Sequence, residues 1–130
     1  MNTGAGIRRR LALGLAVLTA SGLLALAAPG DAQAAASSCA GRKVRTFSFA
    51  TGTVEVYKRR GYVCAVTLAK QPGTRRYMMV SVQARGLQPV VDEGQFTHRA
   101  GPRTVHAGHR CVRVEGAVGG GSYESGWILC

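Results

Sequence analysis

Beyond residue 40 the chain alternates apolar and polar residues with the two-residue period of β-strands. In the segment 78–84 every second residue is apolar, and Ser81 and Gln83 lie between them. This alternation predicts a strand with one face in a core and the other toward solvent. The same period recurs at Val112 and Val114, and no segment shows the pattern of a long amphipathic helix.

Short runs rich in Val, Thr, Tyr, Phe and Met recur with Gly, Pro and Asp between them. The predicted strands span residues 44–49, 53–58, 62–69, 76–84, 90–91 continuing through 95–98, 103–106, 110–114 and 123–129. We interpret 92–94 (Asp-Glu-Gly) and 101–102 (Gly-Pro) as turns, and the glycine-rich segment 118–122 as a flexible loop. Strands spaced in this way predict an all-β fold, a small antiparallel sandwich or barrel.

The segment 57–66, with the sequence YKRRGYVCAV, predicts a β-hairpin. We interpret residues 59–61 as a three-residue loop closed by a glycine in the left-handed region. In that register Val56 pairs with Cys64, and the face that they share with Val54, Val66 and Leu68 is apolar. Cys64 is then expected to point into the core, and the cations to lie at an exposed tip.

Residues 1–36 have the three parts of a secretory signal peptide. Three arginines at 8–10 precede an apolar run over 11–28, and the Ala-Gln-Ala segment 32–34 supplies a cleavage site. Cleavage after Ala34 and cleavage after Ala36 fit equally well. The alternative is an N-terminal membrane anchor, because the run approaches the length of a span. The signal peptide is favoured, which leaves residues 37–130 as one small secreted domain without a membrane span.

The cysteines of the mature chain are Cys39, Cys64, Cys111 and Cys130. An even number of cysteines in an exported chain predicts disulfides, and a domain of this size needs such covalent support. Four cysteines allow three pairings, and the sequence does not decide among them. We favour Cys39–Cys64 with Cys111–Cys130, because sequential pairing ties each end of the chain to a nearby strand.

Basic residues dominate the charged positions, and the formal net charge is +11. Removal of residues 1–36 takes away three arginines and Asp31, which leaves 14 cations against 5 anions, a net charge of +9. Charge alone draws such a domain to polyanions, and outside a cell these include wall polymers, DNA and acidic polysaccharide. The alternative is that the charge only keeps the protein soluble.

Motifs for catalysis are few. No G-x-S-x-G nucleophile motif occurs, and the glycine-rich segment 116–122 lacks the lysine of a phosphate-binding loop. Asp92 and Glu93 are the one adjacent pair of carboxylates, and a hydrolase would need a cleft that gathers them with a histidine. We therefore expect no enzyme activity and assign no catalytic residues.

A metal site and a nucleic-acid site were considered as well. His106, His109 and Cys111, with His98 upstream, are side chains that zinc accepts. A glycine places the histidine pair in a turn, however, and the cysteine is needed for a disulfide, so no metal or other cofactor is expected. Tyrosines and phenylalanines interleave with arginines and a lysine between residues 45 and 96, a mixture that can bind nucleic acid by stacking. The aromatic residues are Phe47, Phe49, Tyr57, Tyr62, Tyr77 and Phe96, and the cations are Arg45, Lys58, Arg59, Arg60, Arg75 and Arg76.

Several short motifs follow one another along residues 52–130. They are GTVEVY at 52–57, GYVCAVT at 61–67, PG at 72–73, RYM at 76–78, VDEG at 91–94, AGP at 100–102, RCV at 110–112 and GWILC at 126–130. In this order they resemble the spore-associated protein A family, small exported proteins of filamentous actinomycetes, and the four cysteines fall where that family has them. The resemblance implies export and association with the spore or aerial-hypha surface, and no established catalytic activity. This chain is more basic than we expect of its relatives.

The sequence therefore predicts a secreted, non-catalytic protein of the spore or cell surface. Basic turns are expected to hold it to anionic wall or spore-coat polymer. The candidate residues are Lys58, Arg59, Arg60, Arg75 and Arg76. The alternatives are a small secreted hydrolase, an inhibitor of a hydrolase, and a protein that binds extracellular nucleic acid.

Overall fold

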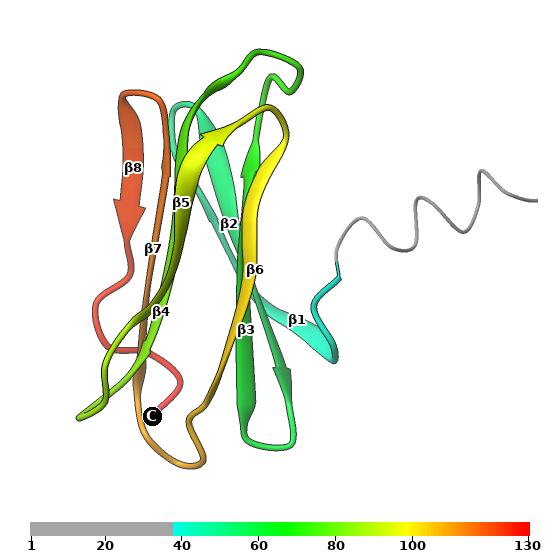
Figure 1. Cartoon of the computed structure of the whole chain (residues 1–130). Coiled ribbons are helices and arrows are strands. Elements are labelled where there is room, and N and C mark those ends of the chain that lie inside the picture. The colour runs from blue at the N-terminus through cyan, green and yellow to red at the C-terminus, as the bar shows by residue number, and fades with distance from the viewer. Residues whose placement is uncertain (1–37) are drawn as a thin grey trace, which may run out of the picture. The chain divides into compact units, whose positions relative to one another are not determined.

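The computed structural model describes residues 38–130, which contain eight β-strands and no helix (Figure 1). The predicted signal peptide, residues 1–36, lies outside the described residues. The strands are β1 (Arg42–Ser48), β2 (Gly52–Arg59), β3 (Tyr62–Ala69), β4 (Arg76–Ala84), β5 (Val90–Phe96), β6 (Arg99–His106), β7 (Val112–Val118) and β8 (Gly121–Glu124). Strands β3 and β4 have the predicted bounds.

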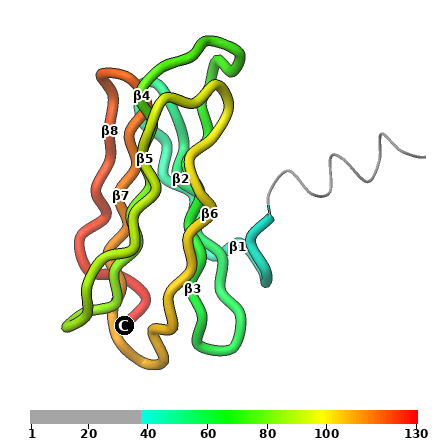
Figure 2. Tube along the Cα trace, in the orientation of Figure 1, coloured from blue at the N-terminus to red at the C-terminus, as the bar shows by residue number. Residues whose placement is uncertain are grey.

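The strands form two four-stranded antiparallel sheets, which pack face to face (Figure 2). One sheet has the order β1-β2-β3-β6, and we name it sheet A. The other has the order β5-β4-β7-β8, and we name it sheet B. The prediction of an all-β antiparallel fold is confirmed, and of the two predicted alternatives the structure is the sandwich and not the barrel.

The core lies between the two sheets and consists mainly of valines. In β4, Met78, Val80, Val82 and Ala84 are all fully buried, which confirms the alternation predicted for this strand. Sheet A contributes the fully buried Val54 and Val56, together with Val63 and Ala65. Burial of a valine or methionine side chain stabilises a fold by about 1.5–3 kcal/mol, so this layer is the main source of stability.

Antiparallel pairing gives the sandwich two distinct ends (Figure 1). The β2–β3 turn, the β4–β5 turn, the β6–β7 loop and the C-terminal segment lie at one end, which we name the hairpin end. Backbone hydrogen bonds join these connections: Gly61 O accepts from Ala107 N at 2.8 Å, and Arg85 N donates to Cys111 O at 2.9 Å. The β3–β4 and β5–β6 connections lie at the far end, where Gly73 N donates to Thr97 O at 2.9 Å.

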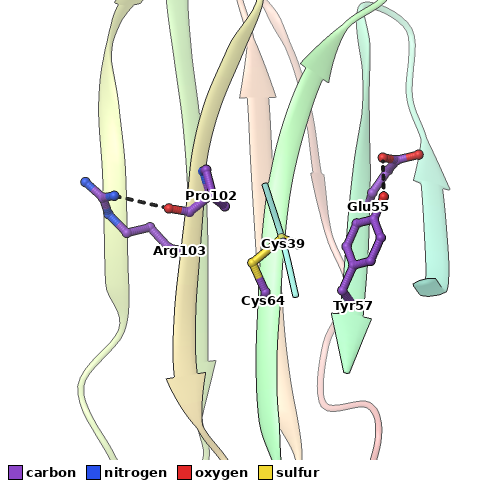
Figure 3. The surroundings of a disulfide bond; sticks show 6 residues. All are labelled: Cys39, Glu55, Tyr57, Cys64, Pro102 and Arg103. Atoms are coloured by element: carbon purple, nitrogen blue, oxygen red, sulfur yellow. Dashed lines mark hydrogen bonds between the residues drawn. A yellow bond between two sulfur atoms is a disulfide. The ribbon is translucent and has the colours of Figure 1, made fainter. Parts of the chain in front are cut away.

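Two disulfides join Cys39 to Cys64 and Cys111 to Cys130, with Cα–Cα distances of 5.7 and 3.9 Å. The favoured pairing is therefore confirmed. The first disulfide ties the segment that precedes β1 to β3 in the middle of sheet A (Figure 3). The second ties the C-terminus to the start of β7, where Val112 also forms an isolated bridge with Ile128.

The β2–β3 hairpin differs from its prediction by one residue. Arg59 pairs with Tyr62, so the turn has two central residues, Arg60 and Gly61, instead of the three predicted. Cys64 consequently pairs with Tyr57 on the outer face of sheet A, and the prediction that it points into the core is wrong. A two-residue turn with positive φ at both positions follows the right-handed twist of the strands, which favours this register.

Three segments interpreted as turns or loops belong to strands instead. Residues 92–94 lie inside β5, and residues 101–102 lie inside β6, where the peptide bond between Gly101 and Pro102 is cis. In the segment 118–122, β7 continues to Val118 and β8 begins at Gly121. Only Gly119 and Gly120 make the turn, because a hairpin between twisted strands needs no more than two residues.

Candidate functional site

The predicted cations Lys58, Arg59 and Arg60 lie at the tip of the β2–β3 hairpin, and all three are exposed. Cross-strand pairing adds a fourth cation, because Arg42 at the start of β1 is opposite Lys58. Arg59 is opposite Tyr62, whose side chain is 52% exposed. The hairpin therefore presents several cations beside an exposed aromatic ring.

The hairpin tip is held against the neighbouring β6–β7 loop. The carbonyl oxygen of Gly61 accepts hydrogen bonds from Ala107 N at 2.8 Å and Gly108 N at 3.0 Å. On the outer face, the rings of Tyr62 and His106 meet edge to face, with centroids 4.8 Å apart. These contacts fix the position of the tip relative to the rest of the hairpin end.

The hairpin end is the most basic part of the described domain. Its exposed arginines and lysine are Arg42, Lys58, Arg59, Arg60, Arg85 and Arg110. All five Asp and Glu side chains of residues 38–130 lie on strands instead: Glu55 on β2, Asp92 and Glu93 on β5, Glu115 on β7 and Glu124 on β8. Within the described residues, the connections of the hairpin end thus carry positively charged side chains and no Asp or Glu side chain.

Arg75 and Arg76 lie at the far end, so the five candidate cations do not form one patch. Arg75 is exposed in the β3–β4 connection. The guanidinium of Arg76 donates hydrogen bonds to the carbonyl oxygens of Gln71 and Thr74, and therefore helps to fix that connection. The two groups belong to opposite ends because β3 crosses the whole length of the sandwich between them.

The negative charge is concentrated on the outer face of sheet B. Glu93 pairs with Met79, and Glu115 pairs with both Ser81 and Glu124, so all three glutamates share one face. Arg113 lies 3.5 Å from Glu124 and partly neutralises this face. Positive and negative charges therefore occupy different parts of the surface, a basic hairpin end and a separate acidic face of sheet B.

An open pocket of about 290 Å³ lies beside the first disulfide on the outer face of sheet A. Its lining residues are Ala40, Arg59, Arg60, Tyr62, Cys64 and Thr104. The surface of the pocket is mostly apolar, although Arg59, Arg60 and Tyr62 are among its lining residues. A pocket of this size is at the low end of ligand sites and accommodates one small group.

Asp92 and Glu93 are adjacent on β5, so their side chains leave opposite faces of the strand. Asp92 accepts a hydrogen bond from Gly101 N at 2.8 Å and lies 3.3 Å from the Arg103 guanidinium, which joins the edges of the two sheets. Glu93 accepts a hydrogen bond from the Tyr77 hydroxyl at 2.8 Å. The paired arrangement on which the hydrolase alternative depended is therefore not formed.

The histidines of the considered zinc site do not converge. His106 packs against Tyr62, and the Nδ1 atom of His98 lies 2.7 Å from the Thr97 hydroxyl. Cys111 is bonded to Cys130. Among residues 38–130, no group of three His, Cys, Asp or Glu side chains is placed to hold a metal ion.

Most of the aromatic residues considered for nucleic-acid stacking face the core or one another. Phe47 stacks on Tyr123 with ring centroids 4.7 Å apart, and Phe49 and Phe96 pack against the core. Tyr57 is only 9% exposed. At the hairpin end, Tyr62 is the ring from this set that remains available for stacking.

Glu55 on the outer face of sheet A holds two neighbouring side chains. It accepts a hydrogen bond from Lys43 Nζ at 2.7 Å. It also accepts one from the Tyr57 hydroxyl at 3.1 Å, which Figure 3 shows. The hydrogen bond to Glu55 raises the pKa of Lys43. Burial, and then the same carboxylate, raise the pKa of Tyr57, whereas the hydrogen bond to Glu93 is the main cause that raises the pKa of Tyr77.

Comparisons with protein-family models, with curated proteins and with solved structures find no match. The two disulfides indicate that the domain folds in an oxidising environment. In the part of the chain that the structure describes, no helix has the length and apolar character to cross a membrane.

Sequence reasoning missed part of the hairpin end. Arg42, Arg85 and Arg110 are far apart in the chain, and only the topology brings them to the same end as Arg59 and Arg60. Each lies at or near the start or end of a predicted strand. Strand direction alternates along the chain in an antiparallel fold, and this alternation would have assigned the three arginines to the same end of the sandwich.

Proposed function

We propose that the protein is a secreted, non-catalytic surface protein whose hairpin end binds anionic polymer of the cell wall or spore coat. The observation that carries the proposal is the separation of charge, with six exposed cations at the hairpin end and the carboxylates elsewhere. A polymer with repeated negative charges is attracted to such an end, and the acidic face of sheet B is directed away from it.

The resemblance to the spore-associated protein A family supports the location of this function at the surface of a spore or aerial hypha. The disulfides agree with a role outside the cytoplasm. The pocket beside the Cys39–Cys64 disulfide gives the polymer a defined contact, because Arg59 and Arg60 are among its lining residues. One unit of the polymer would occupy the pocket beside Arg59 and Arg60, and the anionic groups of neighbouring units would contact Arg42 and Lys58.

The test compares two double variants that remove the same charge from opposite ends. Arg59→Gln with Arg60→Asn changes the hairpin end, and Lys70→Gln with Arg75→Gln changes the far end. The purified proteins are bound to isolated wall polymer and to washed spores, and are eluted with rising salt. We expect all to elute as salt rises, since exposed charge contacts are screened, and the hairpin variant to elute first.

Two results would contradict the proposal. Retention of the unchanged protein that does not depend on salt would exclude an electrostatic attachment. Equal shifts for the two double variants would show that net charge decides binding and that the hairpin end has no special part in it.

Extracellular nucleic acid is the second candidate, because Tyr62 provides an exposed ring among the cations of the hairpin end. A mobility-shift measurement with single-stranded DNA at controlled salt distinguishes it. If stacking contributes, Tyr62→Ala weakens binding to DNA more than it weakens binding to wall polymer.

A further inference from the structure

Most of the large exposed apolar side chains of the described domain lie at or near the same end as the cations, and Tyr77 at the start of β4 is the exception. Leu87 is 47% exposed, Val90 36% and Trp127 37%, and all three lie in or beside the connections of the hairpin end. Tyr62 joins them on the hairpin itself. Attraction to a hydrated polymer gives no reason for exposed leucine and tryptophan, so this feature needs another explanation.

Leu87 is held in an exposed position by its own backbone. Its N–H donates to Ala84 O at 2.9 Å, and its carbonyl oxygen accepts from Gln83 Nε2, also at 2.9 Å. Gly86 has a φ of 86°, which a larger residue adopts only with strain. The β4–β5 turn is therefore a built structure that presents an apolar side chain at its tip.

Trp127 is flanked by arginines. The guanidinium carbon of Arg113 lies 4.7 Å from the centre of the indole ring, and that of Arg85 lies 5.6 Å from it. The next residue, Ile128, exchanges two backbone hydrogen bonds of 2.8 Å with Val112, and the Cys111–Cys130 disulfide closes the segment. The ring is thus fixed at the surface beside cations.

Tryptophan, arginine and isolated exposed aliphatic residues together match the interface of an anionic lipid bilayer. Tryptophan prefers the headgroup level, because its ring is apolar and its N–H is polar. Arginine places its apolar stem along the same region and its charge at the lipid phosphates. Leucine gains free energy when it enters the boundary of the acyl chains.

We propose that the hairpin end also docks on the surface of an anionic lipid bilayer, with Leu87 and Trp127 in the headgroup region. The surrounding cations contact the lipid phosphates, and no Asp or Glu side chain of residues 38–130 lies in the connections of this end to oppose them. The acidic face of sheet B lies along the side of the sandwich. This inference goes beyond attachment to wall polymer, because it uses apolar residues that such attachment leaves without a role.

The experiment uses the mature protein and the fluorescence of Trp127, the one tryptophan of the chain. Vesicles consist of phosphatidylcholine alone or of equal parts of phosphatidylcholine and phosphatidylglycerol. Binding is measured by co-sedimentation, and entry into the headgroup region by a blue shift of the tryptophan emission. We expect binding and a blue shift with the anionic vesicles, and little of either with the neutral ones.

Three variants separate the contributions. Leu87→Ser is expected to weaken binding by roughly tenfold, because the side chain no longer enters the bilayer. Arg85→Gln is expected to weaken it roughly fivefold, about the value of one cation near an anionic surface. Tyr77→Ser removes an exposed ring from the outer face of sheet B, away from the hairpin end, and is expected to leave binding unchanged.

Thermal unfolding of each variant verifies that the fold is retained. The inference would be overturned if the protein sediments with anionic vesicles without a blue shift and Leu87→Ser binds them as tightly as the unchanged protein does. Only electrostatic attraction would then remain. Absence of binding to any vesicle would overturn it as well. In both cases the elution from wall polymer is measured separately, so failure here is distinct from failure of the proposed function.

Discussion

Arg60 and Gly61 both adopt positive φ, 50° and 79°, at the two central positions of the β2–β3 turn. Two such residues in succession make a type I′ turn, whose twist matches that of the flanking strands. Arginine is poorly suited to the first position, because the left-handed region costs a residue with a Cβ roughly 1–2 kcal/mol. The conformation of this one pair fixes the register of the hairpin.

Replacing Arg60 by Asn should therefore stabilise the protein. Asparagine enters the left-handed region more readily, and Asn-Gly is the preferred pair for this turn. We expect the free energy of unfolding in urea, with the disulfides intact, to rise by about 0.5–1 kcal/mol. Arg59→Asn removes the same charge from a strand position and should give no gain. Equal effects of the two substitutions would show that charge, and not the turn, decides the result.

The strands were predictable where only one face of the strand is buried. In β4 the alternation of apolar residues with Ser81 and Gln83 determined both the bounds and the inward face. In β3 the predicted bounds were right but the inward face was not, because Val63 and Ala65 on one face and Cys64 and Val66 on the other are all buried. The segment around Cys39 covers the outer face, and a two-residue period cannot reveal this cover.

The candidate site was predictable only in part, since sequence shows neighbours along the chain and not neighbours across the fold. Lys58, Arg59 and Arg60 stood out because they are consecutive. Arg42 and Arg85 join them only through pairing and topology. The acidic face of sheet B could not be anticipated either, because its glutamates come from β5, β7 and β8.

The two disulfides should differ in what their removal exposes. Each closes a loop of similar length, with separations of 25 and 19 residues, and the chain-entropy model gives roughly 3 kcal/mol for either. Cys39→Ala with Cys64→Ala should cost more than this, because the segment that covers Val66 and Tyr57 is released. Urea unfolding of the two double variants measures the difference. A larger loss for Cys111→Ala with Cys130→Ala would contradict this explanation.

The tyrosines should make the protein sensitive to alkaline pH. The ordinary tyrosine pKa is 10.0, and the folded protein raises the pKa of Tyr57 and of Tyr77 above it. Each therefore contributes stability that is complete below pH 10 and is lost as the pH rises through the raised value. The raised pKa of Lys43 acts in the same direction.

Absorbance of the tyrosinate form, followed from neutral to alkaline pH, tests this directly. We expect part of the signal of the folded protein to appear at higher pH than in urea. Tyr57→Phe and Tyr77→Phe should each remove some of the tyrosinate absorbance that appears at this higher pH. Stability measured over the same range should fall less steeply in Tyr57→Phe than in the unchanged protein. Superimposable titrations of the folded and unfolded protein would contradict the assignment.

Thr67 and Gly116 face each other across the core, where β3 of sheet A packs on β7 of sheet B. The Thr67 hydroxyl is fully buried and has no hydrogen-bond partner within the described residues. A Cβ at Gly116 would lie 2.6 Å from this hydroxyl and would also collide with Val54. The absence of a side chain at residue 116 therefore lets the two sheets approach each other. The buried Thr67 hydroxyl then has no hydrogen bond that compensates for its removal from water.

Two substitutions at this contact should act in opposite directions. Thr67→Val keeps the shape and removes the unsatisfied hydroxyl, so we expect a gain of about 1 kcal/mol in the free energy of unfolding. Gly116→Ala forces a methyl group into a filled space and should cost about 1–3 kcal/mol. Urea unfolding measures both, with Gly120→Ala as the control, since nothing lies within 4 Å of a Cβ there. A loss of stability in Thr67→Val would mean that the hydroxyl has a partner after all, such as a bound water between the sheets.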